Sequence, residues 1–309
     1  MNESVIVNPD PKRLIEGLRD TGYNFCTAVA DLIDNSIAAL ATKVNIFIDM
    51  DYSGNIDLMV ADNGYGMTKD ELITAMKYGS PPDPSPRSLG KFGLGMKTAS
   101  TAFCKRFSVI SRSDHDQELT KATWDLDHVA AKGEWELIIS EPEDIEIDYL
   151  NSAAGNGAGT VIRWEKVDRL LKEYSSPGGK YARKALEKNI DELNEHVSMV
   201  YQRFLDISDE RENQHVNISI NDKDVMPRDP FCVGESELAA HEVVPVGFED
   251  DDQVLGHFNV NAYILPRKGQ YSSEEAEKRA RISSDRQGFY IYRENRLINH
   301  ADWLNMYSQ

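Results

Sequence analysis

An amphipathic helix that leads directly into two short strands sets the first limit on the fold of this chain. Between residues 24 and 41, apolar side chains recur at steps of three and four, which is the spacing of one face of an α-helix. These residues are Phe25, Val29, Leu32, Ile33, Ile37 and Leu40. Residues 44–48 and 56–60 then place an apolar side chain at every second position, which is the period of a half-buried strand. The pattern predicts one helix followed by two strands.

The opposite face of that helix carries oxygen ligands. Asp31, Asp34 and Asn35 stand at i, i+3 and i+4, so their side chains are expected to project from one polar face. Magnesium prefers oxygen ligands and is usually completed by waters and substrate phosphates, so an amide oxygen from Asn35 fits that habit. One of the acids could then orient a water molecule. Taken alone, the same residues also fit a solvated helix face.

A strand-end aspartate and two glycines follow. Asp62 ends the second strand and opens a turn in which Gly64 and Gly66 mark a tight backbone. A carboxylate at this point can accept a hydrogen bond from an exocyclic amine, while the glycines let a flat base approach the backbone. An ordinary loop can carry the same residues, so this motif by itself leaves both interpretations open.

A second glycine-rich segment lies between residues 90 and 97. It follows the proline-rich stretch 81–86, which we expect to be exposed, and it opens a helix expected over 97–104. Its residues are Gly90, Lys91, Phe92, Gly93, Leu94, Gly95, Met96 and Lys97. Backbone N–H groups at the start of a helix favour an anion, and glycine permits its close approach. The spacing is not that of a Walker A loop, and the segment does not follow a strand as a Rossmann turn must. A hinge loop is the alternative.

The order of these elements resembles the GHKL ATPase superfamily, which includes gyrase B, chaperones of the Hsp-ninety type, histidine kinases, MutL and the MORC proteins. Residues 31–36 look like the N-box of that superfamily, 62–67 like its first glycine box and 90–97 like its second. Gly159-Thr160, at the start of a later strand, is similar to its last adenine-side motif. The resemblance covers about residues 10 to 165.

The resemblance implies an α+β chain in two parts. The first, over 1–170, is a GHKL ATP-binding domain with the Bergerat fold, a two-layer α/β sandwich with helices on one face of a mixed sheet. The second, over 171–309, is a smaller transducer-like α+β domain, with the linker Ser175–Gly179 near the boundary. Further strands are expected at 106–111, 118–125, 134–140, 159–164, 215–220, 257–265 and 288–293, a loop at 151–157 and a helix at 181–206.

ATP and Mg²⁺ are the ligands that the resemblance implies. Asn35 would bind the metal, Asp62 the adenine amine and Thr160 the adenine through water. Gly93, Gly95 and Lys97 would hold phosphates, under a lid formed by residues 78–95. The full set of implied nucleotide-binding residues is Asn35, Asp62, Gly64, Gly66, Met67, Gly90, Lys91, Gly93, Leu94, Gly95, Met96, Lys97 and Thr160.

The implied catalytic base departs from the superfamily pattern. GHL-type ATPases place Glu at the first N-box acid, whereas this chain has Asp31. Aspartate is one methylene shorter, and a displacement of about 1 Å can reduce a rate on the order of a hundredfold. Either the site is adapted to Asp31, or turnover is slow and ATP acts mainly as a switch. Lys268 is a weak candidate for the transducer lysine that reaches the γ-phosphate in some relatives; an exposed turn lysine is the alternative.

Two features favour the MORC and chaperone side of the superfamily. They are the Leu-Ile-Asp-Asn-Ser run of residues 32–36 and the segment 287–298, which looks like a transducer strand of MORC-like proteins. The expected function is Mg²⁺-dependent ATP binding and hydrolysis that drives lid closure and N-terminal dimerisation of a molecular clamp or switch. A non-hydrolysing ATP/ADP sensor is the alternative. A protein kinase fits less well, because no His lies in the roughly 20 residues before the N-box helix.

Composition bears on partners and location. The net charge of −18 argues against a surface that coats DNA by charge alone, so a DNA or protein client would need a local surface. No apolar run reaches the roughly 20 residues of a membrane span, and the first residues lack a secretory signal. Three cysteines without metal-ligand spacing (Cys26, Cys104 and Cys232) fit buried positions in a reducing cytoplasm. Residues 303–309 read as the middle of an element, which favours a truncated second domain.

Overall fold

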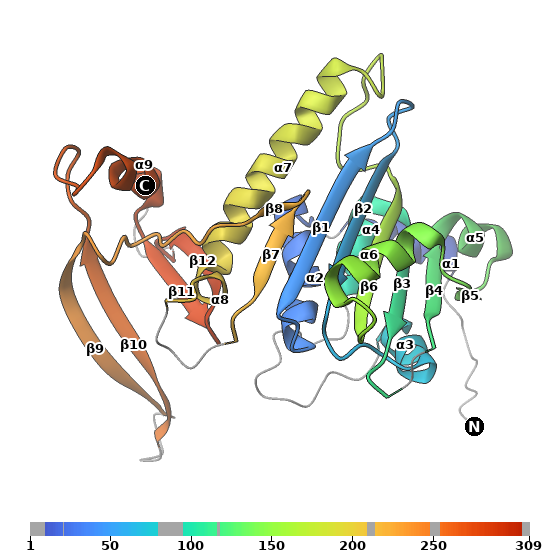
Figure 1. Ribbon diagram of the computed structural model, residues 1–309, viewed down its shortest axis with the longest axis horizontal. Helices are drawn as coiled ribbons and strands as arrows, with labels where there is room; N and C mark the ends of the chain where they lie inside the picture. The colour runs from blue at the N-terminus through green and yellow to red at the C-terminus, as the bar shows by residue number, and fades with distance from the viewer. Residues whose placement is uncertain are drawn as a thin grey trace, which may run out of the picture. The chain divides into compact units, whose positions relative to one another are not determined.

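The computed structural model describes residues 10–20, 22–79, 95–115, 118–208, 214–247 and 254–304. These residues form two compact units (Figure 1). The first contains the described residues up to Ser198 together with Arg203–Met226, and the second contains Met199–Gln202 and the described residues from Pro227 onward. The sequence places the boundary at 170/171. The chain divides later because a strand beyond residue 214 joins the sheet of the first unit.

One mixed sheet forms the centre of the first unit. In the described residues eight strands lie in the order β5-β4-β3-β6-β2-β1-β7-β8. Their bounds are β1 Lys43–Met50, β2 Ile56–Asp62, β3 Cys104–Arg112, β4 Thr120–Asp125, β5 Ile138–Ser140, β6 Gly159–Val167, β7 Asn217–Ile220 and β8 Lys223–Asp224. Neighbouring strands are antiparallel except β1 and β7, which are parallel. The expected mixed sheet is confirmed.

The helix with the apolar stripe, α2 (Phe25–Ala38), forms as the sequence predicts. The side chain of Asn24 accepts a hydrogen bond from the Cys26 N–H (2.8 Å) and caps its first turn. Val29 and Leu32 are fully buried, which is how the stripe stabilises the helix against the sheet. The last residue of the predicted stripe departs from this pattern. Leu40 lies beyond the end of the helix, has a φ of 59° and is 70% exposed.

The other helices of the first unit have these bounds: α1 Pro11–Arg19, α3 Lys69–Met76, α4 Gly95–Phe103, α5 Leu126–Lys132, α6 Asp144–Ala154, α7 Lys180–Val200 and α8 Gln202–Leu205, the last two extending into the second unit. In Figure 1, α2 and α4 lie behind the sheet, whereas α6 lies in front of it. The α/β fold class is therefore confirmed, but the helices do not all lie on one face.

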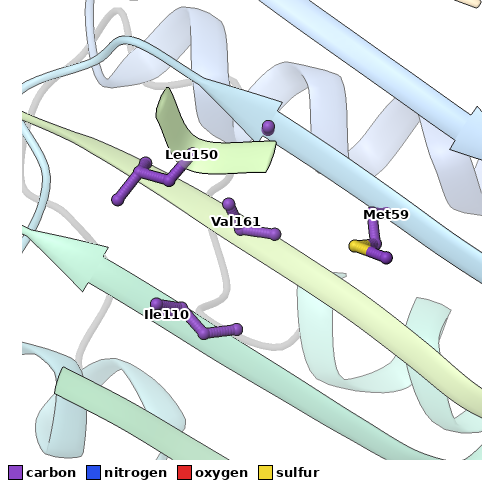
Figure 2. Close-up of a cluster of buried hydrophobic side chains, with 5 residues drawn as sticks. Met59, Ile110, Leu150 and Val161 are labelled. Carbon is purple, nitrogen blue, oxygen red and sulfur yellow. The ribbon is translucent and has the colours of Figure 1, made fainter. Parts of the chain in front are cut away.

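Helix α6 covers the opposite face of the sheet through an apolar cluster. Leu150 of α6 packs on Met59, Ile110 and Val161 from three strands (Figure 2). The expected loop at 151–157 begins inside this helix. Sequence patterning misses α6 because isoleucines alternate with acids at its start, which imitates a strand. In the structure, a capping box between Glu143 and Glu146 stabilises the first turn of a helix at this place.

Buried charges also attach α6 to the sheet. Arg163 of β6 bridges Asp57 of β2 (2.7 Å) and Glu143 (2.8 Å), and Lys121 of β4 bridges Glu146 (2.7 Å). Glu146 is fully buried and Lys121 is 2% exposed, and each also has a second partner: Glu146 pairs with Arg163 (3.3 Å) and Lys121 with Glu143 (3.1 Å). This network lies on the α6 face of the sheet, because Arg163 and Asp57 alternate with residues that face α2.

The second unit is a small α+β structure. Its strands are β9 Glu237–Gly247, β10 Val254–Ile264, β11 Phe289–Arg293 and β12 Arg296–Asp302, which form two antiparallel pairs with helix α9 Glu274–Ala280 and a short 3-10 turn Ser284–Arg286 between them. The expected strands at 257–265 and 288–293 are confirmed. Among the described residues, none of the helices combines the length and apolar character of a bilayer span. Cys104 is buried, and the other two cysteines are half-buried thiols.

Candidate functional site

Asp62 is the last residue of β2, and its carboxylate is buried and held by hydrogen bonds. It is 5% exposed and sits opposite Thr160 of β6 on the α2 face of the sheet. Its Oδ2 accepts a hydrogen bond from the Ser36 hydroxyl of α2 (2.8 Å), and its Oδ1 accepts one from the Gly64 N–H (2.9 Å). Burial raises the pKa of Asp62, while these two donors act in the opposite direction. The carboxylate is therefore held in one orientation.

The two glycines of the following turn are required by close backbone packing. Gly66 has a φ of 65°, and a Cβ there would lie 1.9 Å from the carbonyl oxygen of Arg112. A Cβ on Gly64 would lie 2.7 Å from Ala39, just after the end of α2. The sequence attributes both glycines to the approach of a base. The structure adds a second reason, which is that the turn is pressed between α2 and the end of β3.

Ser111, near the end of β3, connects the turn to β6 and is not indicated by the sequence. Its Oγ accepts a hydrogen bond from the Met67 N–H (2.9 Å) and lies 2.9 Å from the Thr160 hydroxyl and 3.1 Å from the Gly159 oxygen. The side chain is fully buried. A single serine within a strand gives no sequence signal. Its position is visible only once β3 and β6 are paired.

Arg112 holds the loop that precedes Thr160. Its guanidinium donates to the carbonyl oxygens of Gly157 and Gly155, both at 2.7 Å. These carbonyls follow the end of α6, so the arginine satisfies backbone acceptors that the helix leaves unpaired. The start of β6 is therefore fixed from both sides, by Ser111 and by Arg112.

Asp31 lies on α2 where the N-box meets the start of α4. Its Oδ2 accepts a hydrogen bond from the Tyr23 hydroxyl at 2.8 Å. A Cβ built on Gly95, the first residue of α4, would lie 3.5 Å from the same oxygen. The structure thus brings together two of the motifs that the sequence separates by about sixty residues.

The three polar residues of α2 do not share one environment. Asn35 is exposed and lies one turn beyond Asp31, whereas Asp34 is only 8% exposed. The carboxamide of Asn35 fits Mg²⁺, because its oxygen is a hard, accessible ligand on the face that Asp31 also occupies. Within the described ranges, no group of three or more His, Cys, Asp or Glu side chains is placed to hold a metal. A metal at Asn35 would therefore draw most of its ligands from phosphates and water.

Lys97 points into the protein. Its side chain is 2% exposed, and its Nζ donates to the carbonyl oxygen of Ala75 at the end of α3 (2.7 Å). Burial lowers the pKa of this lysine to about 8. Gly95 and Met96 form the first turn of α4 and are half-buried. Of the predicted phosphate-binding residues, Gly90, Lys91, Gly93 and Leu94 lie outside the described residues, as does most of the expected lid at 78–95.

Lys268 belongs to the second unit. It lies in the loop between β10 and α9 and is exposed, which agrees with the simpler interpretation of a turn lysine. Its role toward a γ-phosphate stays a prediction.

Comparison with known proteins identifies the family of the first unit. Residues 23–160 match the family described as histidine kinase-, DNA gyrase B-, and HSP90-like ATPase. A stretch of 92 residues is 32% identical to the mouse (Mus musculus) protein ATPase MORC2B. That stretch covers 28% of this chain and 9% of the mouse protein, so the chain corresponds to a small part of that relative. Residues 23–160 are thus similar to ATPase domains of the GHKL superfamily, and part of the chain is similar to a MORC protein.

Proposed function

We propose that the first unit binds ATP with magnesium between α2, α4 and the ends of β2 and β6, and that it hydrolyses the bound nucleotide. The observation that carries this proposal is the buried Asp62 carboxylate, held by Ser36 and Gly64 directly opposite Thr160. A buried carboxylate whose orientation is fixed by neighbouring donors can select a flat ligand that presents a hydrogen-bond donor to it.

The adenine end of the proposed site consists of Asp62, the Gly64–Gly66 turn, Met67 and Thr160. Asp62 would accept a hydrogen bond from the exocyclic amine, and the Thr160 hydroxyl would reach the ring through water. A base with a carbonyl in place of the amine would bring a second acceptor oxygen against the buried carboxylate, which is costly. We therefore expect a clear preference for adenine over a base that presents a carbonyl at that position.

The phosphate end consists of Asp31, Asn35 and the start of α4. Asn35 would hold the metal, which when bound neutralises phosphate charge. In the hydrolytic step the Asp31 carboxylate accepts a proton from water as the water oxygen bonds to the γ-phosphorus. The bond between that phosphorus and the bridging oxygen breaks, and its electron pair leaves with ADP. The proton of the attacking water therefore ends on Asp31, and the electron pair of the broken bond ends on ADP.

Lid closure and pairing of two copies are the wider parts of the proposal. The buried Lys97 supports a rearrangement, since its amine would have to leave Ala75 to meet a phosphate. Closure over the nucleotide would exclude water from the site. In this scheme ATP turns a clamp or switch that acts on a DNA or protein client. The expected cytoplasmic location also stays a prediction.

A slow or non-hydrolysing sensor is the second candidate, and the short side chain of Asp31 is the observation that favours it. The two functions differ in turnover. Asp31→Asn removes the base and abolishes steady-state ATP hydrolysis in the first case, whereas in the second it leaves a negligible rate unchanged.

The proposal is tested by isothermal titration with ATP in the presence and absence of Mg²⁺, together with phosphate release. Asn35→Ala should weaken magnesium-dependent ATP binding by about tenfold or more, because the metal loses its protein ligand. Asn189→Ala on α7, an asparagine of another helix, is the matched control and should bind as the wild type does. Equal affinity of wild type and Asn35→Ala in magnesium would refute the metal assignment.

A further inference from the structure

The contact between Tyr23 and Asp31 is the feature of the site that the superfamily pattern does not explain. Tyr23 lies just before α2, two residues from its first residue, and its hydroxyl reaches the carboxylate that stands in the position of the catalytic base. The distance of 2.8 Å is that of a well-formed hydrogen bond. Both side chains are half-buried, so water competes weakly for either group.

The surroundings of Tyr23 keep its hydroxyl protonated, so the hydroxyl can donate a hydrogen bond. Burial raises the pKa of Tyr23, and the hydrogen bond and charge of Asp31 raise it further, whereas a hydrogen bond with Thr98 of α4 acts the other way. Tyr23 is therefore protonated throughout the neutral range and cannot serve as the base. What it can do is donate to a carboxylate, and such charge-assisted hydrogen bonds are stronger than neutral ones.

The same phenol also connects the two helices that form the phosphate end. Thr98 belongs to the first turn of α4, and its hydroxyl lies 3.2 Å from the Gly95 oxygen. A Cβ built on Gly95, in the same turn, would lie 3.5 Å from the Asp31 carboxylate. One tyrosine thus contacts the carboxylate on α2 and a side chain of α4, at the point where the two helices approach each other.

We propose that Tyr23 is a positioning residue for Asp31: its hydroxyl holds the short carboxylate at the start of α4, where a longer glutamate would reach unaided. This inference rests on the proposed hydrolytic function and deepens it. An aspartate free to rotate would spend most of its time in rotamers that face away from the attacking water. A fixed rotamer keeps the shorter carboxylate in one position, which would offset part of the rate loss that its displacement causes.

The first test separates catalysis from binding. Tyr23→Phe keeps the ring and removes only the hydroxyl, so we expect kcat for ATP hydrolysis to fall about tenfold, the equivalent of one lost hydrogen bond in the transition state. The Kd for Mg²⁺-ATP should stay within about twofold of the wild-type value, because Tyr23 contacts none of the proposed nucleotide ligands. Tyr52→Phe, on an exposed residue of the β1–β2 turn, is the matched control and should change neither quantity.

The second test does not depend on activity. In the nucleotide-free protein, thermal unfolding of Tyr23→Phe, Asp31→Ala and the double variant forms a double-mutant cycle. We expect the loss in Tm of the double variant to be smaller than the sum of the two single losses, since both changes remove the same hydrogen bond. Additive losses would show that the two side chains are uncoupled and would overturn the inference.

The outcomes distinguish this inference from the function on which it rests. If Asp31→Asn abolishes hydrolysis while Tyr23→Phe retains the wild-type kcat, the positioning role is wrong and the ATPase assignment stands. If Tyr23→Phe lowers kcat and Kd rises in parallel, the tyrosine supports the fold of the pocket and does not position the base. If Asp31→Asn has no effect on hydrolysis, the proposed catalytic function itself fails.

Discussion

The adenine end and the phosphate end of the proposed site differ in how far they are assembled. At the adenine end, Asp62, Ser111 and Thr160 lie on paired strands, and the polar atoms of their side chains are tied by hydrogen bonds that the structure already contains. At the phosphate end, Asn35 is exposed and Lys97 is bonded to a backbone carbonyl inside the protein. The polar groups of the first region are already paired along the sheet, whereas those of the second lie on helices α2 and α4.

Under the proposed function, this difference would place recognition and switching on different elements. A base-binding end built into a sheet can select ATP or ADP without any rearrangement. In the proposal, a phosphate end on α2 and the start of α4 would respond to the γ-phosphate by moving. We therefore expect changes at the adenine end to alter affinity for all adenine nucleotides, and changes at the phosphate end to separate ATP from ADP.

The largest effect is expected for Asp62→Ala. Removing the carboxylate deletes the acceptor for the adenine amine and frees the Ser36 hydroxyl, so affinity for ATP and ADP should both fall about a hundredfold. Titration calorimetry measures the affinities, and thermal unfolding without nucleotide checks that the protein is folded. If Asp62→Ala lowered the affinity for ATP but left the affinity for ADP unchanged, the assignment of Asp62 to adenine binding would be contradicted.

A smaller effect, with a defined pH dependence, is expected from Lys97. Its pKa of about 8 in the free protein means that the amine is charged at pH 7 and largely neutral at pH 9. If Lys97 moves to a phosphate, the anion raises the pKa of the amine, so ATP binding should take up a fraction of a proton between about pH 8 and 10 and almost none at pH 7.

Calorimetry in buffers of different ionisation enthalpy measures how many protons are taken up when ATP binds. Lys97→Met should abolish the proton uptake. It should also lower the affinity for ATP by about tenfold and the affinity for ADP by less. Proton uptake that persists in Lys97→Met would mean that another group titrates, and the buried lysine would then be structural. The unliganded Lys97→Met variant should also lack the gain in stability that the wild type shows as pH rises from 8, because the neutral amine suits the buried site better.

The smallest effect is expected for Ser111→Ala. The Thr160 hydroxyl and the Met67 N–H lose one shared partner, so affinity for both ATP and ADP should fall about fivefold, the equivalent of one neutral hydrogen bond. Ser108→Ala is a useful control on the same strand but the opposite face of the sheet, since its hydroxyl bonds Thr123 of β4 and lies nearer the start of β3. Unequal losses for ATP and ADP in Ser111→Ala would place this residue outside the adenine end.

Local patterns account for what the sequence predicts correctly. Helix α2, strands β1 and β2, and the turn after Asp62 depend on periodicity and on glycine, and each is expressed within a few residues. The resemblance to a known superfamily then orders these elements, and residues 23–160 match that family. Asp31, Asp62 and Thr160 are proposed as site residues in this way, because each lies in a recognisable motif, and their roles stay predictions.

What the sequence misses depends on tertiary contacts. The contributions of Tyr23 and Ser111 arise from partners that are eight and forty-nine residues away, and no spacing rule links them. The direction of the Lys97 side chain is decided by burial against Ala75, which a glycine-lysine motif does not reveal. The late domain boundary has the same origin, since β7 is assigned to the first unit only by its pairing with β1.

A structure of the protein with Mg²⁺ and an unhydrolysable ATP analogue is the decisive measurement. It should place the exocyclic amine of the base within hydrogen-bonding distance of the Asp62 carboxylate and the metal on the Asn35 amide oxygen, with Tyr23 still bonded to Asp31. An analogue bound elsewhere, or a complex in which Asp62 keeps only its Ser36 and Gly64 partners and Asn35 faces bulk water, would contradict the proposed nucleotide site.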